Sequence, residues 1–273
     1  MPKWLLKTKR GYRAWLTPYL RRMKTVLITG ATAGFGEACA TIFAKNGYRL
    51  LINGRRTERL QSLQEKLKNE YDTACYLLPF DVQDREAVFS AIESLPAEWQ
   101  DIDVLINNAG LALGRDLFHE ANLNDWETMI DTNVKGLLYV SKAVVPLMIR
   151  RKAGHIINIG SVAGKNVYEK GNVYCASKAA VDSVSHGMRI DLLAHRVKVT
   201  AVHPGAAETE FSLVRFKGDA ETAKKVYDGL QPLTATDVAD VVYYCASLPP
   251  HVCINDLVLT ATQQADGIHI YRE

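Results

Sequence analysis

A chain of 273 residues with 48% hydrophobic and 23% charged residues has an ordinary globular composition, which excludes a collagen-like or largely disordered protein. No run of 18 apolar residues occurs, which excludes a transmembrane helix. The net charge of +3 is uneven, because residues 1–22 hold seven of the 33 basic residues and no acid. Residues 23–273 therefore carry 26 basic and 30 acidic side chains, and the overall charge gives no indication of nucleic-acid binding.

The first 22 residues differ in composition from the rest of the chain. Their compact apolar run, Trp4-Leu5-Leu6, is too short for the core of a secretory signal peptide. A basic segment with aromatic residues could touch a membrane surface or act as a targeting peptide. Composition favours a loosely attached extension, or a start of translation at Met23. We predict a basic extension over residues 1–22 and one domain over residues 23–273.

Cysteine and histidine residues are scattered. None of the five cysteines forms a CxxC pair, and the seven histidines show no metal-ligand spacing. The sequence therefore predicts no metal site and no disulfide framework, and favours a reducing compartment.

From residue 24 onward, short apolar runs alternate with helical patterns. We expect the first helix to end at Asn46-Gly47, a C-cap pair. The second should run from a Thr57 cap to about residue 69, and the third from an Asp84 cap to Leu95. One long helix should cover residues 125–148. The expected strands cover residues 24–29, 48–53, 75–80, 104–107, 155–159, 198–202 and 254–259. This alternation predicts a single-domain α/β fold, a doubly wound (Rossmann) sheet of about seven parallel strands with helices on both faces.

A glycine-rich loop lies where the first strand meets the first helix. Glycines there permit a tight turn and let the backbone approach a pyrophosphate, while the helix N-terminus supplies N–H donors. The Gly-x3-Gly-x-Gly spacing differs from the usual dinucleotide fingerprint, and a tight turn without a ligand is the alternative interpretation. At the first strand of a doubly wound sheet we favour phosphate binding, with the loop residues Gly30, Thr32, Ala33, Gly34, Phe35 and Gly36.

The end of the second predicted strand bears on the choice of dinucleotide. It reads Asn53-Gly54-Arg55-Arg56 and lacks the acidic residue that accepts hydrogen bonds from the ribose of NAD. Guanidinium groups pair with a 2′-phosphate, whereas an acid repels it. Two solvated surface arginines are the alternative. We predict NADP as the cofactor, with Arg55 and Arg56 at its 2′-phosphate.

Three residues suggest a site for proton transfer. Ser161 follows the fifth predicted strand, and Tyr174 lies four residues before Lys178 on one face of a helix. A lysine ammonium beside the phenol should lower the tyrosine pKa from its usual value near 10, as proton exchange at neutral pH requires. Ser161 could then hold a substrate oxygen while Tyr174 transfers its proton.

With these motifs in this order, residues 23–273 resemble the short-chain dehydrogenase/reductase family. The glycine loop, Asn107-Asn108-Ala109-Gly110 after the fourth strand, Ser161 with Tyr174 and Lys178, and Pro204-Gly205 carry the likeness. The resemblance implies a catalytic tetrad of Asn133, Ser161, Tyr174 and Lys178, in which the Asn133 carbonyl holds a water that relays protons through Lys178. It also implies cofactor contacts from Asp81, Val82, Asn108, Ala109, Gly110, Tyr174, Lys178, Pro204, Gly205 and Thr209.

A closer likeness is to the NADP-dependent serine and 3-hydroxy acid dehydrogenases. It rests on residues 110–114, 125–133, 209–212 and 214–218, and it implies a cytoplasmic homotetramer that acts on small 3-hydroxy acids and the matching semialdehydes. The basic extension and Ala206-Ala207 depart from that pattern. Of the two cations in the expected lid, Arg215 and Lys217, we expect Arg215 to face the substrate carboxylate, because it can bind bidentately. A solvated or intersubunit role is the alternative.

The function predicted from sequence is therefore hydride transfer between NADP(H) and the 3-hydroxyl or carbonyl group of a small acid. Two alternatives stay open. One is a carbonyl reductase of the same family for a bulkier uncharged substrate, and the other is a non-catalytic NADP(H)-binding sensor. Sensors of that kind typically lose the tyrosine or the lysine, and both are present here.

Overall fold

The computed structural model describes residues 22–273. Seven parallel strands form one sheet in this range, as the sequence predicted, and the structure gives their order as β3-β2-β1-β4-β5-β6-β7. The order reverses between β1 and β4, so the connections on either side of this pair diverge and leave a crevice at the carboxyl ends of the strands. The strands are β1 (Thr25–Ile28), β2 (Arg49–Asn53), β3 (Cys75–Leu78), β4 (Ile102–Asn107), β5 (Gly154–Ile159), β6 (Val197–Pro204) and β7 (Asp256–Leu259).

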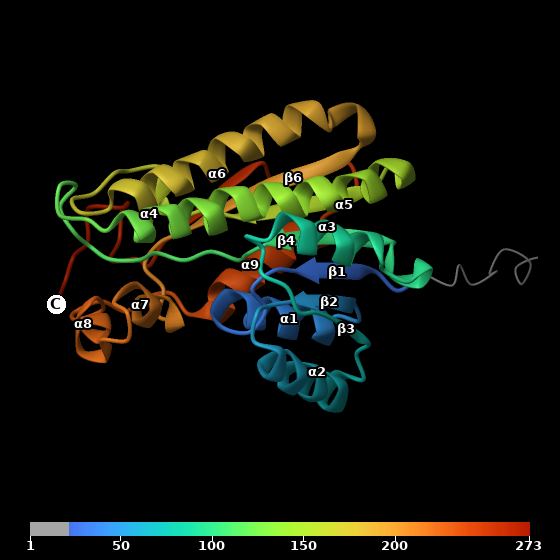
Figure 1. Ribbon diagram of the computed structural model, residues 1–273, viewed down its shortest axis with the longest axis horizontal. Helices are drawn as coiled ribbons and strands as arrows, with labels where there is room; N and C mark the ends of the chain where they lie inside the picture. Colours follow the sequence, from blue (N-terminus) through green and yellow to red (C-terminus); the bar gives the residue numbers. More distant parts are fainter. Residues whose placement is uncertain (1–21) are drawn as a thin grey trace, which may run out of the picture.

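Helices cover both faces of the sheet (Figure 1). One layer contains α1 (Gly34–Lys45), α2 (Thr57–Tyr71) and α9 (Ala235–Ser247). The other contains α3 (Arg85–Glu93), α4 (Leu123–Ile130), α5 (Leu137–Arg151) and α6 (Asn172–Asp191). Two short helices, α7 (Glu210–Arg215) and α8 (Ala220–Lys225), follow β6 beside the carboxyl ends of the strands.

The buried strands explain why their sequences are continuous apolar runs. In β1, Val26 and Ile28 pack in the core beneath α1, α2 and α9, whereas Leu27 packs in the core beneath α3 and α5. Successive side chains of a strand point to opposite faces, and here helices cover both faces. All three side chains are fully buried. The polar residues of the site therefore lie where the strands end.

Several local predictions are confirmed and others need correction. Helix α1 ends at an Asn46 cap, and Asp84 caps α3 by accepting a hydrogen bond from Ala87 N. The expected Thr57 cap was wrong, because Thr57 is the first helical residue and Arg56 occupies the cap position without a side-chain cap bond.

The helix expected over residues 125–148 is longer and less regular than predicted. It begins at Leu123 and ends at Arg151, and a π-helical segment, Asp131–Gly136, separates α4 from α5. Helix α9, whose Thr234 and Asp237 form a capping box, was not predicted from the sequence.

Arg22 is the one residue of the amino-terminal extension that the structure describes. The guanidinium of Arg22 pairs with Asp103, at 2.5 Å, and with Asp101, at 3.4 Å, so Arg22 is attached to the domain. The prediction of a loose extension otherwise concerns residues 1–21, which lie outside the described residues. Within residues 22–273, no helix combines the length and apolar character needed to span a membrane. All five cysteines are free.

Candidate active site

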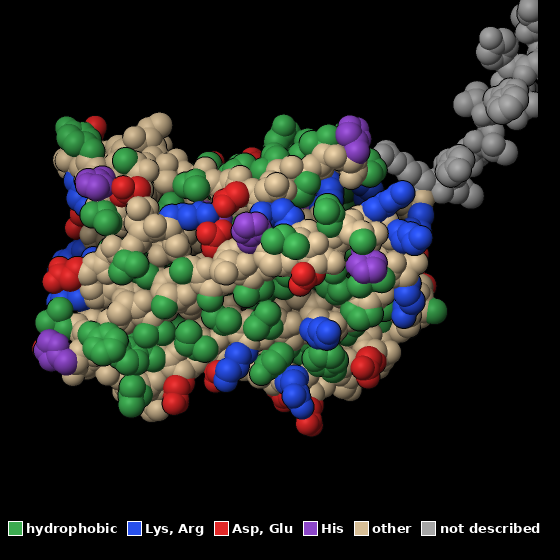
Figure 2. Space-filling view, turned by 90° about the horizontal axis from the view of Figure 1, so that it is seen from above, with side chains coloured by type: hydrophobic (Ala, Val, Ile, Leu, Met, Phe, Trp, Pro, Cys, Tyr) green, Lys and Arg blue, Asp and Glu red, His purple; other side chains and the backbone are tan. Residues whose placement is uncertain are grey.

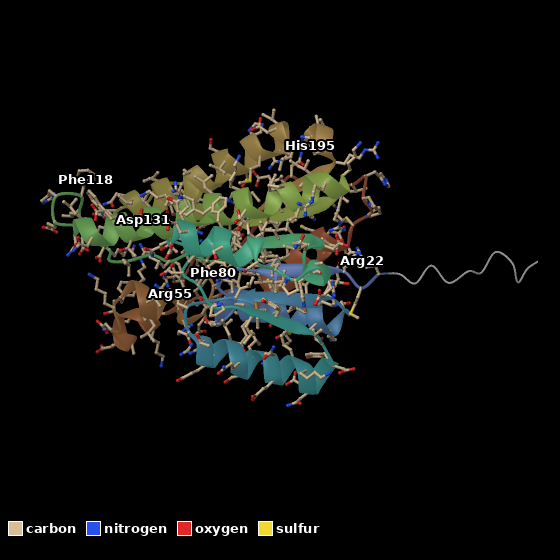
Figure 3. The ribbon with its side chains drawn as sticks, turned by 45° about the vertical axis from the view of Figure 1, so that its right-hand side comes forward. Arg22, Arg55, Phe80, Phe118, Asp131 and His195 are labelled. Atoms are coloured by element: carbon tan, nitrogen blue, oxygen red, sulfur yellow. The ribbon has the colours of Figure 1, made fainter. Side chains whose placement is uncertain are left out.

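The predicted site residues gather around a cavity of about 330 Å³ at the carboxyl ends of the strands. It extends from the glycine loop to the segment after β6, across the point where the strand order reverses. Arg55 and Phe80 lie close together beside it, far from Arg22 at the other end of the strands (Figure 3). The site residues from the sequence analysis that line this cavity are Gly30, Thr32, Ala33, Gly34, Phe35, Arg55, Arg56, Asp81, Val82, Asn108, Ala109, Gly110, Ser161, Tyr174, Lys178, Pro204, Gly205 and Thr209.

The glycine loop has the shape that close approach of a phosphate requires. Gly30 and Gly34 have φ angles of +63° and +52°, a region that side chains disfavour. Gly36 does not line the cavity but packs beneath it, because a Cβ there would lie 2.2 Å from the Gly30 carbonyl oxygen. The loop turns tightly into the N-terminus of α1, whose N–H groups can bind an anion.

Asn108 and Ala109 hold this loop from the neighbouring strand. The amide Nδ2 of Asn108 donates to the carbonyl oxygens of Thr29, at 2.9 Å, and Gly30, at 3.1 Å. The backbone N–H groups of Asn108 and Ala109 both donate to Thr29 Oγ1 at 3.0 Å. The pair therefore shapes the glycine loop as well as lining the cavity.

Arg55 and Arg56 flank the end of the cavity that follows β2. Arg55 Nη1 lies 3.4 Å from Asp81 Oδ2, and Arg56 Nη2 donates to Thr32 Oγ1 at 2.9 Å. Glu210, at the start of α7, pairs with Arg59 at 2.9 Å and with Arg56 at 3.4 Å. Arg56 is thus held against the glycine loop through Thr32, whereas Arg55 is held by Asp81, and both arginines line the cavity.

Ser161, Tyr174 and Lys178 meet at the other end of the cavity. Ser161 follows β5, and its Oγ accepts a hydrogen bond from Ala163 N at 3.1 Å. Tyr174 and Lys178 lie one turn apart on α6, and Lys178 Nζ donates to the Ile159 carbonyl oxygen at 2.9 Å. All three side chains are largely buried yet line the cavity, so a substrate there would meet a hydroxyl, a phenol and an amine.

The electrostatics of this group differ from the expectation. Burial raises the pKa of Tyr174 above its usual value, although a hydrogen bond with Ser161 and the charge of Arg215 act in the opposite direction. Burial also lowers the pKa of Lys178 to about 8. The predicted lowering of the tyrosine pKa was therefore wrong for the protein alone, because loss of hydration opposes the phenolate more strongly than nearby cations favour it.

Asn133 lies in the π-helical segment and is buried behind the cavity. Its Oδ1 accepts from Leu111 N, and its Nδ2 donates to the Leu111 carbonyl oxygen, both at 2.8 Å. The same amide donates to Ser177 Oγ on α6 at 3.0 Å. The side chain therefore ties the long helix to the cavity wall and to the Tyr174 helix, a role that the sequence analysis missed. A π turn alters the backbone hydrogen bonding at this position.

Arg215 does not line the main cavity. Its Nη1 donates to the Tyr168 hydroxyl at 3.0 Å, and its guanidinium carbon lies 5.5 Å from the centre of the Tyr174 ring. Its Nη2 is buried and has no hydrogen-bond partner among residues 22–273. Lys217, by contrast, pairs with Asp125 at 2.8 Å. Of the two lid cations, Arg215 is the one beside Tyr174, and it retains an unsatisfied donor.

Comparisons with known proteins agree with this geometry. A family model described as short chain dehydrogenase matches residues 24–219. The chain belongs to the short-chain dehydrogenase family. An NADP-dependent 3-hydroxy acid dehydrogenase of Salmonella typhi is 50% identical over 249 residues, which cover 90% of this chain and 99% of that protein.

Two further relatives of this short-chain dehydrogenase are named for serine. A serine 3-dehydrogenase of Rhizobium radiobacter is 45% identical over 250 residues, which cover 91% of this chain and 98% of that protein. The solved closed form of a serine dehydrogenase complexed with NADP+ has a TM-score of 0.85 and 48% identity, and the match covers 91% of this chain and 100% of that one.

Some residues of the short-chain dehydrogenase site were missed because no local pattern marks them. Thr29 was placed at the end of the first strand and the start of the glycine loop without a role of its own, Glu210 was noted only within residues 209–212, and Tyr168 was not singled out. Their positions beside Asn108, Arg215 and Arg56 depend on contacts between distant segments. A single threonine, tyrosine or glutamate has no sequence period that could have identified these contacts.

Proposed function

We propose that this short-chain dehydrogenase uses NADP(H) to interconvert small 3-hydroxy acids, including serine-like substrates, and the matching carbonyl compounds or semialdehydes. The observation that carries the proposal is one cavity with Arg55 and Arg56 at one end and Ser161, Tyr174 and Lys178 at the other. Its volume of about 330 Å³ is within the usual range for ligand sites. The NADP named for two of the relatives supports the same cofactor.

The glycine loop, Arg55 and Arg56 would hold the pyrophosphate and the 2′-phosphate. The other cofactor contacts would come from the cavity-lining residues given above, with Thr209 and Lys178 near the reacting end. When bound, the nicotinamide supplies or accepts the hydride. The protein supplies orientation and the path of the proton.

In the direction of carbonyl reduction, Ser161 donates a hydrogen bond to the substrate oxygen and Tyr174 donates its phenolic proton to it. Burial raises the pKa of Tyr174, which keeps the proton on the phenol until the substrate oxygen gains negative charge. Asn133 acts at a distance from the substrate by holding the Leu111 backbone and α6 together. The proposal also includes a proton relay in which the Asn133 backbone carbonyl holds a water next to Lys178.

The substrate carboxylate would bind to Arg215. An ionised carboxylate that leaves water needs a cation or several N–H donors. Arg215 has a buried donor that finds no partner in the described part of the chain, and it lies against the Tyr174 ring. Tyr168 holds the guanidinium in place through its hydroxyl group. These contacts support a small acid as the substrate more than a bulky uncharged carbonyl compound.

The test of the function is NADPH oxidation with malonic semialdehyde and with uncharged carbonyl compounds, and NADP reduction with serine. Turnover of the acids, with weaker turnover of the uncharged compounds, is the expected result. A clear preference for bulky uncharged carbonyls would replace the 3-hydroxy acid assignment. Cofactor binding without turnover of any compound would favour the non-catalytic sensor.

The Tyr174→Phe variant tests the proton donor. It should keep its affinity for NADPH and lose at least about 10²-fold in kcat, the usual contribution of a positioned acid. Near-normal turnover of this variant would remove Tyr174 from the mechanism.

The proposal includes a homotetramer in the cytoplasm. Large apolar side chains are exposed on the layer that contains α5 and α6, among them Leu138 and Ile190, and Figure 2 shows hydrophobic side chains spread over a face of the molecule seen from that side. Val258 is exposed on the edge strand β7. Such surfaces are typical of contacts between subunits. Five free cysteines support a reducing compartment.

A further inference from the structure

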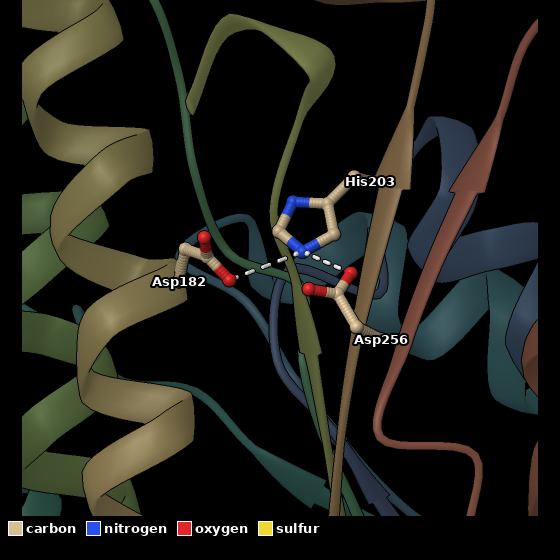
Figure 4. A group of neighbouring side chains, drawn as sticks. All are labelled: Asp182, His203 and Asp256. Atoms are coloured by element: carbon tan, nitrogen blue, oxygen red, sulfur yellow. Dashed lines mark ion pairs between the residues drawn. The ribbon is translucent and has the colours of Figure 1, made fainter. Parts of the chain in front are cut away.

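Four titratable side chains from separate segments meet next to the Ser161 segment. Lys165 follows the turn after Ser161, and its Nζ donates to Asp182 Oδ2 on α6 at 2.8 Å and to Asp256 Oδ2 on β7 at 2.7 Å. His203 on β6 faces the other carboxylate oxygens, with its Nε2 3.5 Å from Asp182 Oδ1 and 3.1 Å from Asp256 Oδ1 (Figure 4). We call these four residues the Lys165 cluster.

The Lys165 cluster contains groups that could bind a divalent cation, because ligand atoms of Asp182, His203 and Asp256 lie within 4.8 Å of one another. However, the Lys165 ammonium already contacts both carboxylates and would repel a second cation at this point. The arrangement therefore favours an internal ion-pair network over a metal centre.

His203 is fully buried within this network. Burial lowers its pKa, and the charge of Lys165 acts in the same direction, whereas Asp256, Asp182 and the backbone of Ser161 act to raise it. Because the net direction is downward, the imidazole is largely uncharged at neutral pH. Neither ring nitrogen has a hydrogen-bond partner among residues 22–273, so the contribution of His203 is the packing of its ring against the segments around it.

The cluster contacts the Ser161 segment at both ends. At the start, Gly160 packs against the imidazole so closely that a Cβ on Gly160 would lie 2.4 Å from His203 Nδ1. At the end, Lys165 is bound to α6 and β7. Between them, Gly164 N donates to the Ser161 carbonyl oxygen at 2.9 Å, which closes the turn. The position of Ser161 is therefore set by contacts on either side of it.

Helix α6 connects this cluster to the proton donor. Tyr174 and Asp182 are eight residues apart on α6, and the cluster joins Asp182 to the segment that carries Ser161. A salt-bridged network that spans both elements limits how far they can move relative to one another. A shift of about 1 Å between reacting groups can reduce a rate by roughly 10²-fold.

We propose that the Lys165 cluster positions Ser161 relative to Tyr174, so that Lys165, Asp182, His203 and Asp256 are positioning residues for proton transfer. This inference rests on the proposed role of Ser161 as the group that holds the substrate oxygen. It assigns no contact between the cluster and the substrate, and it predicts an effect on kcat with little effect on cofactor affinity.

The test compares Lys165→Met, Asp182→Asn and Lys165→Arg in the full chain. Lys165→Met and Asp182→Asn should each lower kcat by at least about 10-fold, while the Kd for NADPH, measured by fluorescence titration, changes less than about 2-fold. Lys165→Arg keeps a cation between the carboxylates and should recover most of kcat. Lys66→Met, which removes an exposed ion pair with Glu37, is the matched control and should leave kcat unchanged.

A double-mutant cycle separates positioning from a general loss of stability. If the cluster acts through Ser161, then Lys165→Met should cause no further loss of kcat in a Ser161→Ala background. The same fold-loss in both backgrounds would overturn the inference, as would kcat within about 2-fold of normal in both Lys165→Met and Asp182→Asn. If thermal melting shows that Lys165→Met is unfolded at the assay temperature, the same comparison of kcat in the two backgrounds is made with Asp182→Asn.

The single variant Ser161→Ala tests the proposed function independently. A normal rate for Ser161→Ala would remove Ser161 from the mechanism, and the role of the cluster with it. A large loss in Ser161→Ala together with normal rates in the cluster variants would contradict the positioning role alone.

Discussion

Replacement of Arg55 and Arg56 by alanine should weaken binding of NADP far more than binding of NAD. The two cofactors differ only at the 2′-phosphate, and both arginines line the cavity that the glycine loop also lines. The Arg55 and Arg56 side chains are 64% and 46% exposed, so solvent screens their charges. A charge-assisted hydrogen bond contributes about 1.5–3 kcal/mol, and this exposure places each arginine near the lower limit, or roughly 10-fold in Kd.

Arg56 should have the larger effect of the two. It is less exposed, and its loss would leave Glu210 paired with Arg59 alone, so that a carboxylate would face the dianionic phosphate with less compensation. The double variant should therefore lose roughly 10- to 100-fold in affinity for NADPH. Its affinity for NADH should change by less than about 3-fold.

Fluorescence titration with NADPH and NADH measures both affinities directly. Arg85→Ala is a suitable control, because Arg85 lies at the start of α3 and does not line the cavity. An equal loss for both cofactors would show that Arg55 and Arg56 do not recognise the 2′-phosphate and would refute the reasoning from their position.

Three other perturbations have outcomes that follow from the structure. Gly36→Ala should weaken NADPH binding by at least about 10-fold, because its Cβ would lie 2.2 Å from the Gly30 oxygen. Gly187→Ala on α6 is the control, because a Cβ there would meet no atom of the described residues within 4 Å beyond its chain neighbours and its own helix backbone, and it should raise the melting temperature slightly. Arg215→Ala should raise KM for 3-hydroxy acids by roughly 10-fold or more and hardly change KM for an uncharged alcohol; parallel losses would indicate a structural role. Burial lowers the pKa of His155 to about 3, so the unfolded chain binds the additional proton between that value and 6.5, and the free energy of unfolding should fall as the pH falls through this range. The fall attributable to His155 is on the order of 5 kcal/mol. Urea denaturation at several pH values should show a smaller pH dependence in His155→Gln, and an unchanged dependence would exclude this histidine as its source.

Local patterns in the sequence were sufficient to predict the class of fold. Strands such as β1 are continuous apolar runs because both of their faces are buried. A run of about four to six apolar residues is therefore enough to indicate such a strand. The glycine loop, Ser161 and the Tyr174–Lys178 pair were also visible, because each motif lies within one turn or one helix. The ends of several helices were less predictable, since Arg56 could occupy a cap position without a capping side chain.

Tertiary structure decided what the motifs contact. The sequence could not show that Asn133 binds the Leu111 backbone, that Arg215 stacks beside Tyr174, or that burial raises the tyrosine pKa. The Lys165 cluster likewise joins residues as far apart as 91 positions in the chain. Periodicity and capping act over a few residues, whereas desolvation and ion pairing depend on which distant segments the parallel sheet brings together.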